Sequence, residues 1–177
     1  MAAAGVRLFA ALELPAEPRA ALAAWAQSLP PDPALRLVAP ENLHVTLVFL
    51  GAQKEEGVEA IAGAMTAAAQ PVEELSVAGA AWLPSGRPAV LVADLTAGER
   101  VLALQQAVVG ALGPWRVPEE RPFRPHVTVA RVRRGRRPEI AIAEPPRVSF
   151  PPAALVLYRS RPGGRAAVYE PVATVAL

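Results

Sequence analysis

The sequence contains no cysteine, and this absence excludes a disulfide scaffold, a cysteine nucleophile and a thiolate metal site. It contains only two histidines, His44 and His126, which are too few for a histidine-rich metal centre. No apolar run reaches the roughly 18 residues that a membrane span needs, and the first residues lack the pattern of a signal peptide. We therefore expect a cytoplasmic protein with no membrane association, no metal and no cofactor.

Lysine is nearly absent, because Lys54 is the only one among 18 basic residues. The charges are also unevenly placed: six basic and eleven acidic residues precede Trp115, whereas twelve basic and five acidic residues follow it. Arginine binds phosphate in a bidentate manner, so a basic second half favours an anionic partner such as nucleic acid. A genome that encodes arginine in place of lysine explains the same bias equally well.

The chain of 177 residues, 53% hydrophobic, is long enough to bury a core and too apolar to be disordered. Apolar periodicity and turn residues predict three helices and several short strands. The helices are expected over 16–29, 55–70 and 98–112. The strands are expected over 6–14, 35–38, 42–50, 75–83, 88–95, 125–132, 148–150, 154–158 and 166–172, the last two being joined through Gly163 and Gly164.

An internal repeat is visible in this order of elements. The segment AALELPAEPRAAL resembles the later LVADLTAGERVLAL, with Glu13 matching Asp94 at an offset of 81 residues. Each copy is followed by a strand that carries His-Val-Thr, and His44 and His126 are 82 residues apart. Two nearly equal offsets predict a single α+β domain over residues 1–177, made of two pseudo-symmetric lobes.

Both histidines lie in a His-x-Thr motif within a predicted strand. Residues i and i+2 of a strand share a face, so His44 lies beside Thr46, and His126 lies beside Thr128. Two imidazoles near neutrality supply one acid and one base, and two hydroxyls donate to phosphate oxygens. The set suits metal-free in-line displacement at phosphorus. The alternative is that each histidine is an ordinary strand residue with a satisfied hydrogen bond.

With these motifs and their flanks, the chain resembles the RNA 2′,3′-cyclic phosphodiesterases, or 2′-5′ RNA ligases, of the two-histidine phosphoesterases. The matching segments include PENLHVTL at 40–47 and RPFRPHVTVAR at 121–131. The resemblance implies a bilobal duplicated α+β fold, in which two antiparallel-rich sheets with outer helices flank a central cleft that carries the two His-x-Thr motifs. It also implies hydrolysis of RNA 2′,3′-cyclic phosphate ends to 2′-phosphomonoesters, with His44 as proton donor and His126 as base. Thr46, Thr128 and Arg131 would bind the substrate.

Several nearby side chains have two interpretations. Strict alternation puts Arg131 on the face opposite His126, unless a bulge or the strand end redirects it. Phe49 holds the matching position in the first copy, and we expect a core aromatic there rather than a base-stacking one. Phe123 and Arg124 flank the motif and could touch RNA. The cluster of Arg133, Arg134, Arg136 and Arg137 is either a solvated turn or a patch that follows the RNA backbone.

Two other functions remain open at this stage. The same acid and base would also join a cyclic-phosphate end to a 5′-hydroxyl end through a 2′-5′ bond. A non-catalytic module that binds RNA or nucleotides is the third possibility, although it would have been free to lose one of the motifs. The expected partners are RNA with 2′,3′-cyclic phosphate ends, tRNA fragments among them, or small cyclic nucleotides. We expect the protein to be a monomer.

Overall fold

The computed structural model describes residues 5–163 and 166–177. Its strands are β1 (Val6–Glu13), β2 (Leu35–Leu37), β3 (His44–Gln53), β4 (Leu75–Leu83), β5 (Val90–Ala97), β6 (His126–Val132), β7 (Ser149–Phe150), β8 (Ala154–Arg161) and β9 (Val168–Ala176). Its helices are α1 (Ala16–Ser28), α2 (Val58–Ala67) and α3 (Glu99–Ala111), with short 3₁₀ turns η1 (Pro40–Asn42) and η2 (Glu55–Gly57). Gly164, predicted to help link the last two strands, lies outside the described residues.

The strands form one curled antiparallel sheet in the order β7-β4-β5-β6-β3-β1-β8-β9, and β2 pairs with β6. This order has two equivalent halves that meet at the β6–β3 junction. On either side of the junction, β6 matches β3 and β5 matches β1. The α+β class and the antiparallel strands are therefore confirmed. The two predicted sheets are joined into one by the pairing of Val45 with Val127.

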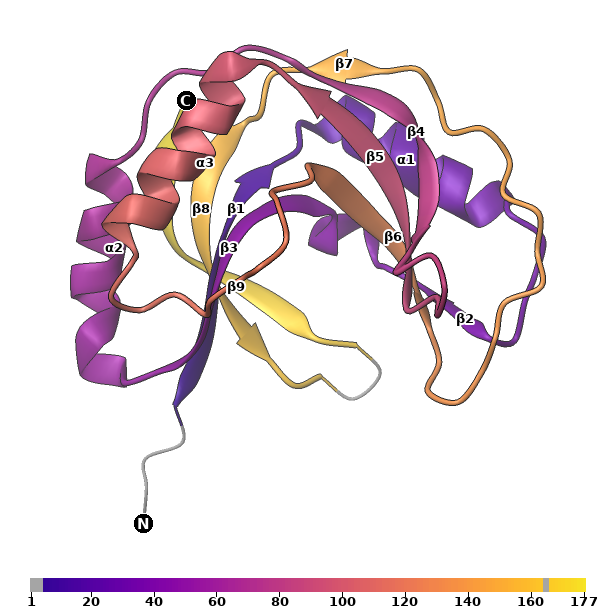
Figure 1. Ribbon diagram of the computed structural model, residues 1–177, viewed down its shortest axis with the longest axis horizontal. Helices are drawn as coiled ribbons and strands as arrows, with labels where there is room; N and C mark the ends of the chain where they lie inside the picture. The colour runs from indigo at the N-terminus through magenta and orange to yellow at the C-terminus, as the bar shows by residue number, and fades with distance from the viewer. Residues whose placement is uncertain (1–4, 164–165) are drawn as a thin grey trace.

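The helices cover the outside of this sheet (Figure 1). Each half of the sheet packs against a helix whose preceding strand belongs to the other half. Helix α1 follows β1 but packs against β6, whereas α3 follows β5 and packs mainly against β3. The predicted apolar face of α3 is confirmed, since Val101, Leu104, Val108 and Leu112 are all fully buried. This exchange leaves the inner face of the central strands free of helices.

Most element boundaries differ from the predicted ones by a few residues, and three of these differences have local reasons. The helix expected over 55–70 begins with the 3₁₀ turn η2, and α2 ends at Ala67, ahead of Pro71. Strand β3 continues past its predicted end because Gly51 adopts a φ of 66°, which other residues rarely do. Strand β9 continues to Ala176, beyond its predicted end, and it contains Pro171, which an edge strand tolerates because one of its sides has no ladder to complete.

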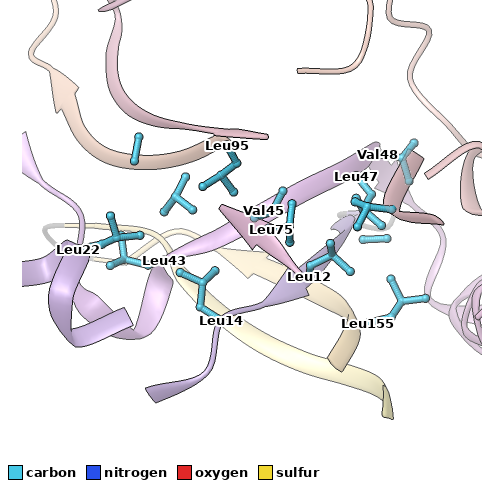
Figure 2. Close-up of a cluster of buried hydrophobic side chains, with 14 of the residues drawn as sticks. Leu12, Leu14, Leu22, Leu43, Val45, Leu47, Val48, Leu75, Leu95 and Leu155 are labelled. Carbon is cyan, nitrogen blue, oxygen red and sulfur yellow. The ribbon is translucent and has the colours of Figure 1, made fainter. Parts of the chain in front are cut away.

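The core lies between the helices and the outer face of the sheet (Figure 2). Leu12, Val45, Leu75 and Leu155 are among its residues, each at most 1% exposed. Val127 on β6 is also fully buried, so both central strands direct one apolar face into this core. Within the described residues, no helix is long and apolar enough to cross a bilayer.

Candidate active site

The two His-x-Thr motifs lie on the two central strands, on the face away from the core. His44, Thr46, His126 and Thr128 are half-buried, whereas Val45 and Val127 between them are fully buried. The predicted alternation is thus confirmed in both copies. Because Val45 is opposite Val127, antiparallel register places His44 beside Thr128 and Thr46 beside His126. The four polar side chains therefore form one patch at the β6–β3 junction, where the two halves of the sheet meet.

Each imidazole is held through its Nδ1 atom by the same kind of contact. Nδ1 of His44 lies 2.7 Å from the carbonyl oxygen of Asn42, and Nδ1 of His126 lies 2.7 Å from that of Arg124. A carbonyl only accepts, so Nδ1 donates in both rings and Nε2 remains for other chemistry. Nε2 of His44 is 3.0 Å from Oγ1 of Thr46. Nε2 of His126 has no hydrogen-bond partner in the described part of the chain.

His44 lies against an aromatic cluster. Its ring centroid is 4.9 Å from that of Phe9, 5.4 Å from that of Tyr169 and 6.2 Å from that of Tyr158. Burial is the main reason that the pKa of His44 falls from 6.5 to about 4. The Asn42 carbonyl opposes this fall, and the charges of Arg131 and His126 add to it. His44 of the free protein is therefore neutral at pH 7.

Arg131 reaches the histidine face because β6 contains a bulge. Val92 of β5 pairs with Thr128 and Leu91 pairs with Ala130, so Val129 is an extra residue in β6. Val129 and Ala130 are both buried, and alternation then returns Arg131 to the face of His126. The effect of Arg131 on the pKa of His44 agrees with this placement. The carbonyl of Val129 accepts a bond from the Val38 amide at 2.9 Å, which fixes the bulge.

The first copy contains the equivalent bulge, and it overturns the prediction for Phe49. Ala10 pairs with Val48 and Ala11 pairs with Thr46, so Leu47 is the extra residue. Its carbonyl accepts a bond from the Gln105 side chain at 3.4 Å. Phe49 is 58% exposed, so the prediction of a core aromatic was wrong. The histidine face thus has an aromatic side chain in one half and an arginine at the matching position of the other.

Sequence reasoning missed the carboxylates opposite the histidines. Glu13 pairs with His44 across β1 and β3, and Asp94 pairs with His126 across β5 and β6. Arg124 donates to Asp94 through Nε at 2.8 Å and Nη2 at 2.6 Å. The guanidinium that could have touched RNA is therefore engaged within the protein. The repeat already aligned Glu13 with Asp94, which was a signal that the two carboxylates occupy matching places, but which residue lies opposite each histidine depends on strand pairing.

The remaining features lie around this face or away from it. Arg133, Arg134, Arg136 and Arg137 are all exposed on the turn after β6, where Gly135 adopts a φ of 73°. One surface hollow lies between β4 and residues 142–149, and another lies between α1 and β2; neither is lined by a histidine. Among the described residues, no group of three or more histidine or carboxylate side chains is arranged to hold a metal ion.

Comparisons with known proteins agree with the arrangement. Residues 14–164 match the model of the 2′-5′ RNA ligase superfamily. The chain is 35% identical over 136 residues to an RNA 2′,3′-cyclic phosphodiesterase of Escherichia coli K12, covering 71% of each protein. The structure of TT0787 from Thermus thermophilus superposes with a TM-score of 0.85, at 26% identity and with 97% of each chain covered.

A second solved structure resembles the chain just as extensively. Escherichia coli LigT complexed with 3′-AMP superposes with a TM-score of 0.82, at 28% identity and with 98% of each chain covered. The family match spans most of the sequence and includes both His-x-Thr strands. This chain belongs to the 2′-5′ RNA ligase superfamily.

Proposed function

We propose that this protein hydrolyses 2′,3′-cyclic phosphate ends of RNA to 2′-phosphomonoesters. The observation that carries the proposal is the pair of His-x-Thr motifs on one face of adjacent strands, with each ring donating through Nδ1 to a carbonyl. Each Nε2 is therefore the atom available for proton transfer to or from a substrate. The Escherichia coli relative is named for this reaction.

In the proposed reaction, water attacks phosphorus in line with the 3′-oxygen. His126 accepts a proton from the water through Nε2, and His44 donates a proton to the 3′-oxygen as the phosphorus–oxygen bond breaks. The product carries a 2′-phosphate and a free 3′-hydroxyl. Thr46 and Thr128 donate to the non-bridging oxygens, and Arg131 stabilises the negative charge that builds on them. No atom of the reaction requires a metal or cofactor in this scheme.

The low pKa of His44 bears directly on its role as donor. At about 4, it leaves the ring neutral at pH 7 in the free protein. An anionic cyclic phosphate beside the ring favours the protonated form and raises the pKa. His44 therefore gains its proton when the substrate binds. If His44 were instead the base, its ring would already be neutral in the free protein at pH 7, which is the form that accepts a proton.

The substrate class follows from the side chains around the patch. Phe49 offers an exposed ring for a base, and Arg131 offers a cation for phosphate. The arginines at 133–137 lie beyond Arg131 on the same strand and its turn, where they would contact the phosphates of a longer RNA such as a tRNA fragment. The protein would act in the cytoplasm as a monomer, as one domain of two pseudo-symmetric lobes.

The experiment that tests this function is turnover of nucleoside 2′,3′-cyclic monophosphates, and of an RNA that ends in one, in the presence of EDTA. ³¹P NMR identifies the product isomer. Formation of the 2′-phosphate, lost in His44→Ala and His126→Ala variants, supports the proposal. Formation of the 3′-phosphate contradicts the bond assignment. Specific binding of the same ends without turnover would instead make the chain a binding module.

Ligation is the second candidate, because the matched family carries that name. The same residues would transfer the cyclic phosphate to a 5′-hydroxyl in place of water, forming a 2′-5′ bond. Supplying a second RNA with a 5′-hydroxyl in the same assay distinguishes the two outcomes. A joined product that exceeds the hydrolysed one would favour ligation.

A further inference from the structure

The carbonyls that orient the two histidines come from segments without strand pairing. Asn42 ends the 3₁₀ turn η1, and Arg124 lies in the irregular segment between α3 and β6. Each is two residues before its histidine. Because a neutral imidazole can carry its proton on either nitrogen, displacement of the carbonyl would release the ring to the other tautomer. These segments therefore need an anchor of their own.

In the second half the anchor is an ion pair with β5. The guanidinium of Arg124 makes two parallel bonds to the Asp94 carboxylate, at 2.8 and 2.6 Å. Asp94 is the residue opposite His126 in the β5–β6 ladder. The Pro125 carbonyl also accepts a bond from the Leu95 amide at 3.0 Å. Two successive residues ahead of His126 are thus tied to two successive residues of β5.

The geometry of this pair suits a positioning role. The Asp94 side chain is only 22% exposed, so its interaction with Arg124 is less screened than a fully exposed ion pair. Two parallel bonds to a planar guanidinium fix its orientation as well as its position, which a single ammonium contact does not. The Arg124 carbonyl belongs to the residue that is held in this way.

The first half achieves the same result by different contacts. Glu13, opposite His44, pairs with Arg19 of α1 at 3.1 Å. Asn42 is anchored instead by its own side chain, whose Nδ2 donates to the Ala167 carbonyl at 3.0 Å. The duplicated motif therefore relies on two independent anchors. A change at one anchor should disturb one histidine and leave the other in place.

We propose that Arg124, held by Asp94, is a positioning residue for His126. Its carbonyl keeps His126 in the Nδ1–H tautomer, so that the lone pair of Nε2 faces the substrate. This role rests on the proposed function of His126 as the base that accepts a proton from water. Removing the ion pair should lower kcat more than it raises KM, because the substrate contacts of Thr46, Thr128 and Arg131 remain.

The test uses Arg124→Ala, Arg124→Lys and Asp94→Asn, with Arg121→Ala as the matched control. Arg121 lies in the same segment and also forms an ion pair, with Glu119 at 3.0 Å, but its side chain is 77% exposed. ¹⁵N NMR of the histidine rings, at a pH where they are neutral, reports the tautomer of each. Steady-state kinetics on a cyclic mononucleotide and thermal unfolding accompany the spectra.

We expect His126 to be the Nδ1–H tautomer in the wild type and in Arg121→Ala, and a mixture of tautomers in Arg124→Ala. His44 should keep its tautomer in every variant. A misplaced catalytic group costs between about tenfold and a hundredfold in rate, which is the fall in kcat expected for Arg124→Ala. Arg124→Lys should recover part of this loss, because it restores the charge but not the second bond.

Several outcomes would overturn the proposal. One is an Arg124→Ala variant that matches Arg121→Ala in both tautomer and kcat. Another is a fall in kcat with the His126 tautomer unchanged. If Arg124→Ala fails to fold, the nearly isosteric Asp94→Asn decides by the same readouts. If the wild type turns over no cyclic phosphate, the proposed function fails, yet the spectra still show whether the ion pair sets the tautomer.

Discussion

Replacing His44 by glutamine should remove a loss of stability that the wild-type protein shows in mild acid. The pKa of His44 is lowered to about 4, mainly by burial. In the unfolded chain the same ring has its ordinary value of 6.5. Between these two values the unfolded state binds a proton that the folded state does not, so acid favours unfolding.

The size of this effect follows from the two pKa values. One pKa unit corresponds to about 1.4 kcal/mol, so the full difference amounts to about 3 kcal/mol. The penalty is absent well above pH 6.5, grows as the pH falls and is complete below about pH 4. We therefore expect the free energy of unfolding of the wild type to fall by about 3 kcal/mol more than that of His44→Gln between pH 7 and pH 4.

Urea unfolding of both proteins at a series of pH values in this range measures the difference. The carboxylates titrate in both proteins, so their contribution cancels when the two curves are subtracted. An NMR titration of the imidazole C–H signals gives the pKa of His44 independently. Parallel stability curves, or an imidazole that titrates near its ordinary value, would refute the reasoning.

Four further predictions concern the proposed activity. His44→Ala and His126→Ala should each lower kcat by about a hundredfold or more while circular dichroism shows the fold intact; retained turnover in either would contradict the acid–base pair. Arg131→Gln should raise the pKa of His44 in an NMR titration, since it removes a repelling charge, and should raise KM for a cyclic mononucleotide. Phe49→Ala should weaken nucleotide binding by about 1–3 kcal/mol in calorimetry if the ring stacks on a base. Phe49→Ala should also lower the free energy of unfolding far less than Phe9→Ala. The latter should lower it by about 3–5 kcal/mol, because Phe9 is only 4% exposed. Replacing the four arginines at 133–137 by glutamine should lower the salt dependence of RNA binding by up to about three units of log–log slope; an unchanged slope would make the cluster a solvated turn.

The elements that position the histidines could be predicted from the sequence because their signals are local. Alternation within His44–Thr46 and His126–Thr128 gave the correct face, and the apolar spacing of α3 gave its buried side. Each of these inferences depends on residues close together in the chain.

The side chains that surround the histidines were harder to place, because they depend on pairing between distant strands. A bulge exists only relative to the partner strand, so Leu47 and Val129 could not be identified as the extra residues from β3 or β6 alone. The bulge at Leu47 is why Phe49 was wrongly assigned to the core. The union of the two sheets through Val45 and Val127 was likewise invisible without the structure.

That union at one residue pair has a mechanical consequence. In any rotation of one half of the sheet against the other about this pair, each atom moves in proportion to its distance from the axis. The outer strands β7 and β9 form the two ends of the sheet and travel furthest, whereas the two imidazoles flank the axis and travel least. A twist between the two halves would therefore change the spacing between the two imidazoles far less than the positions of the sheet's outer edges.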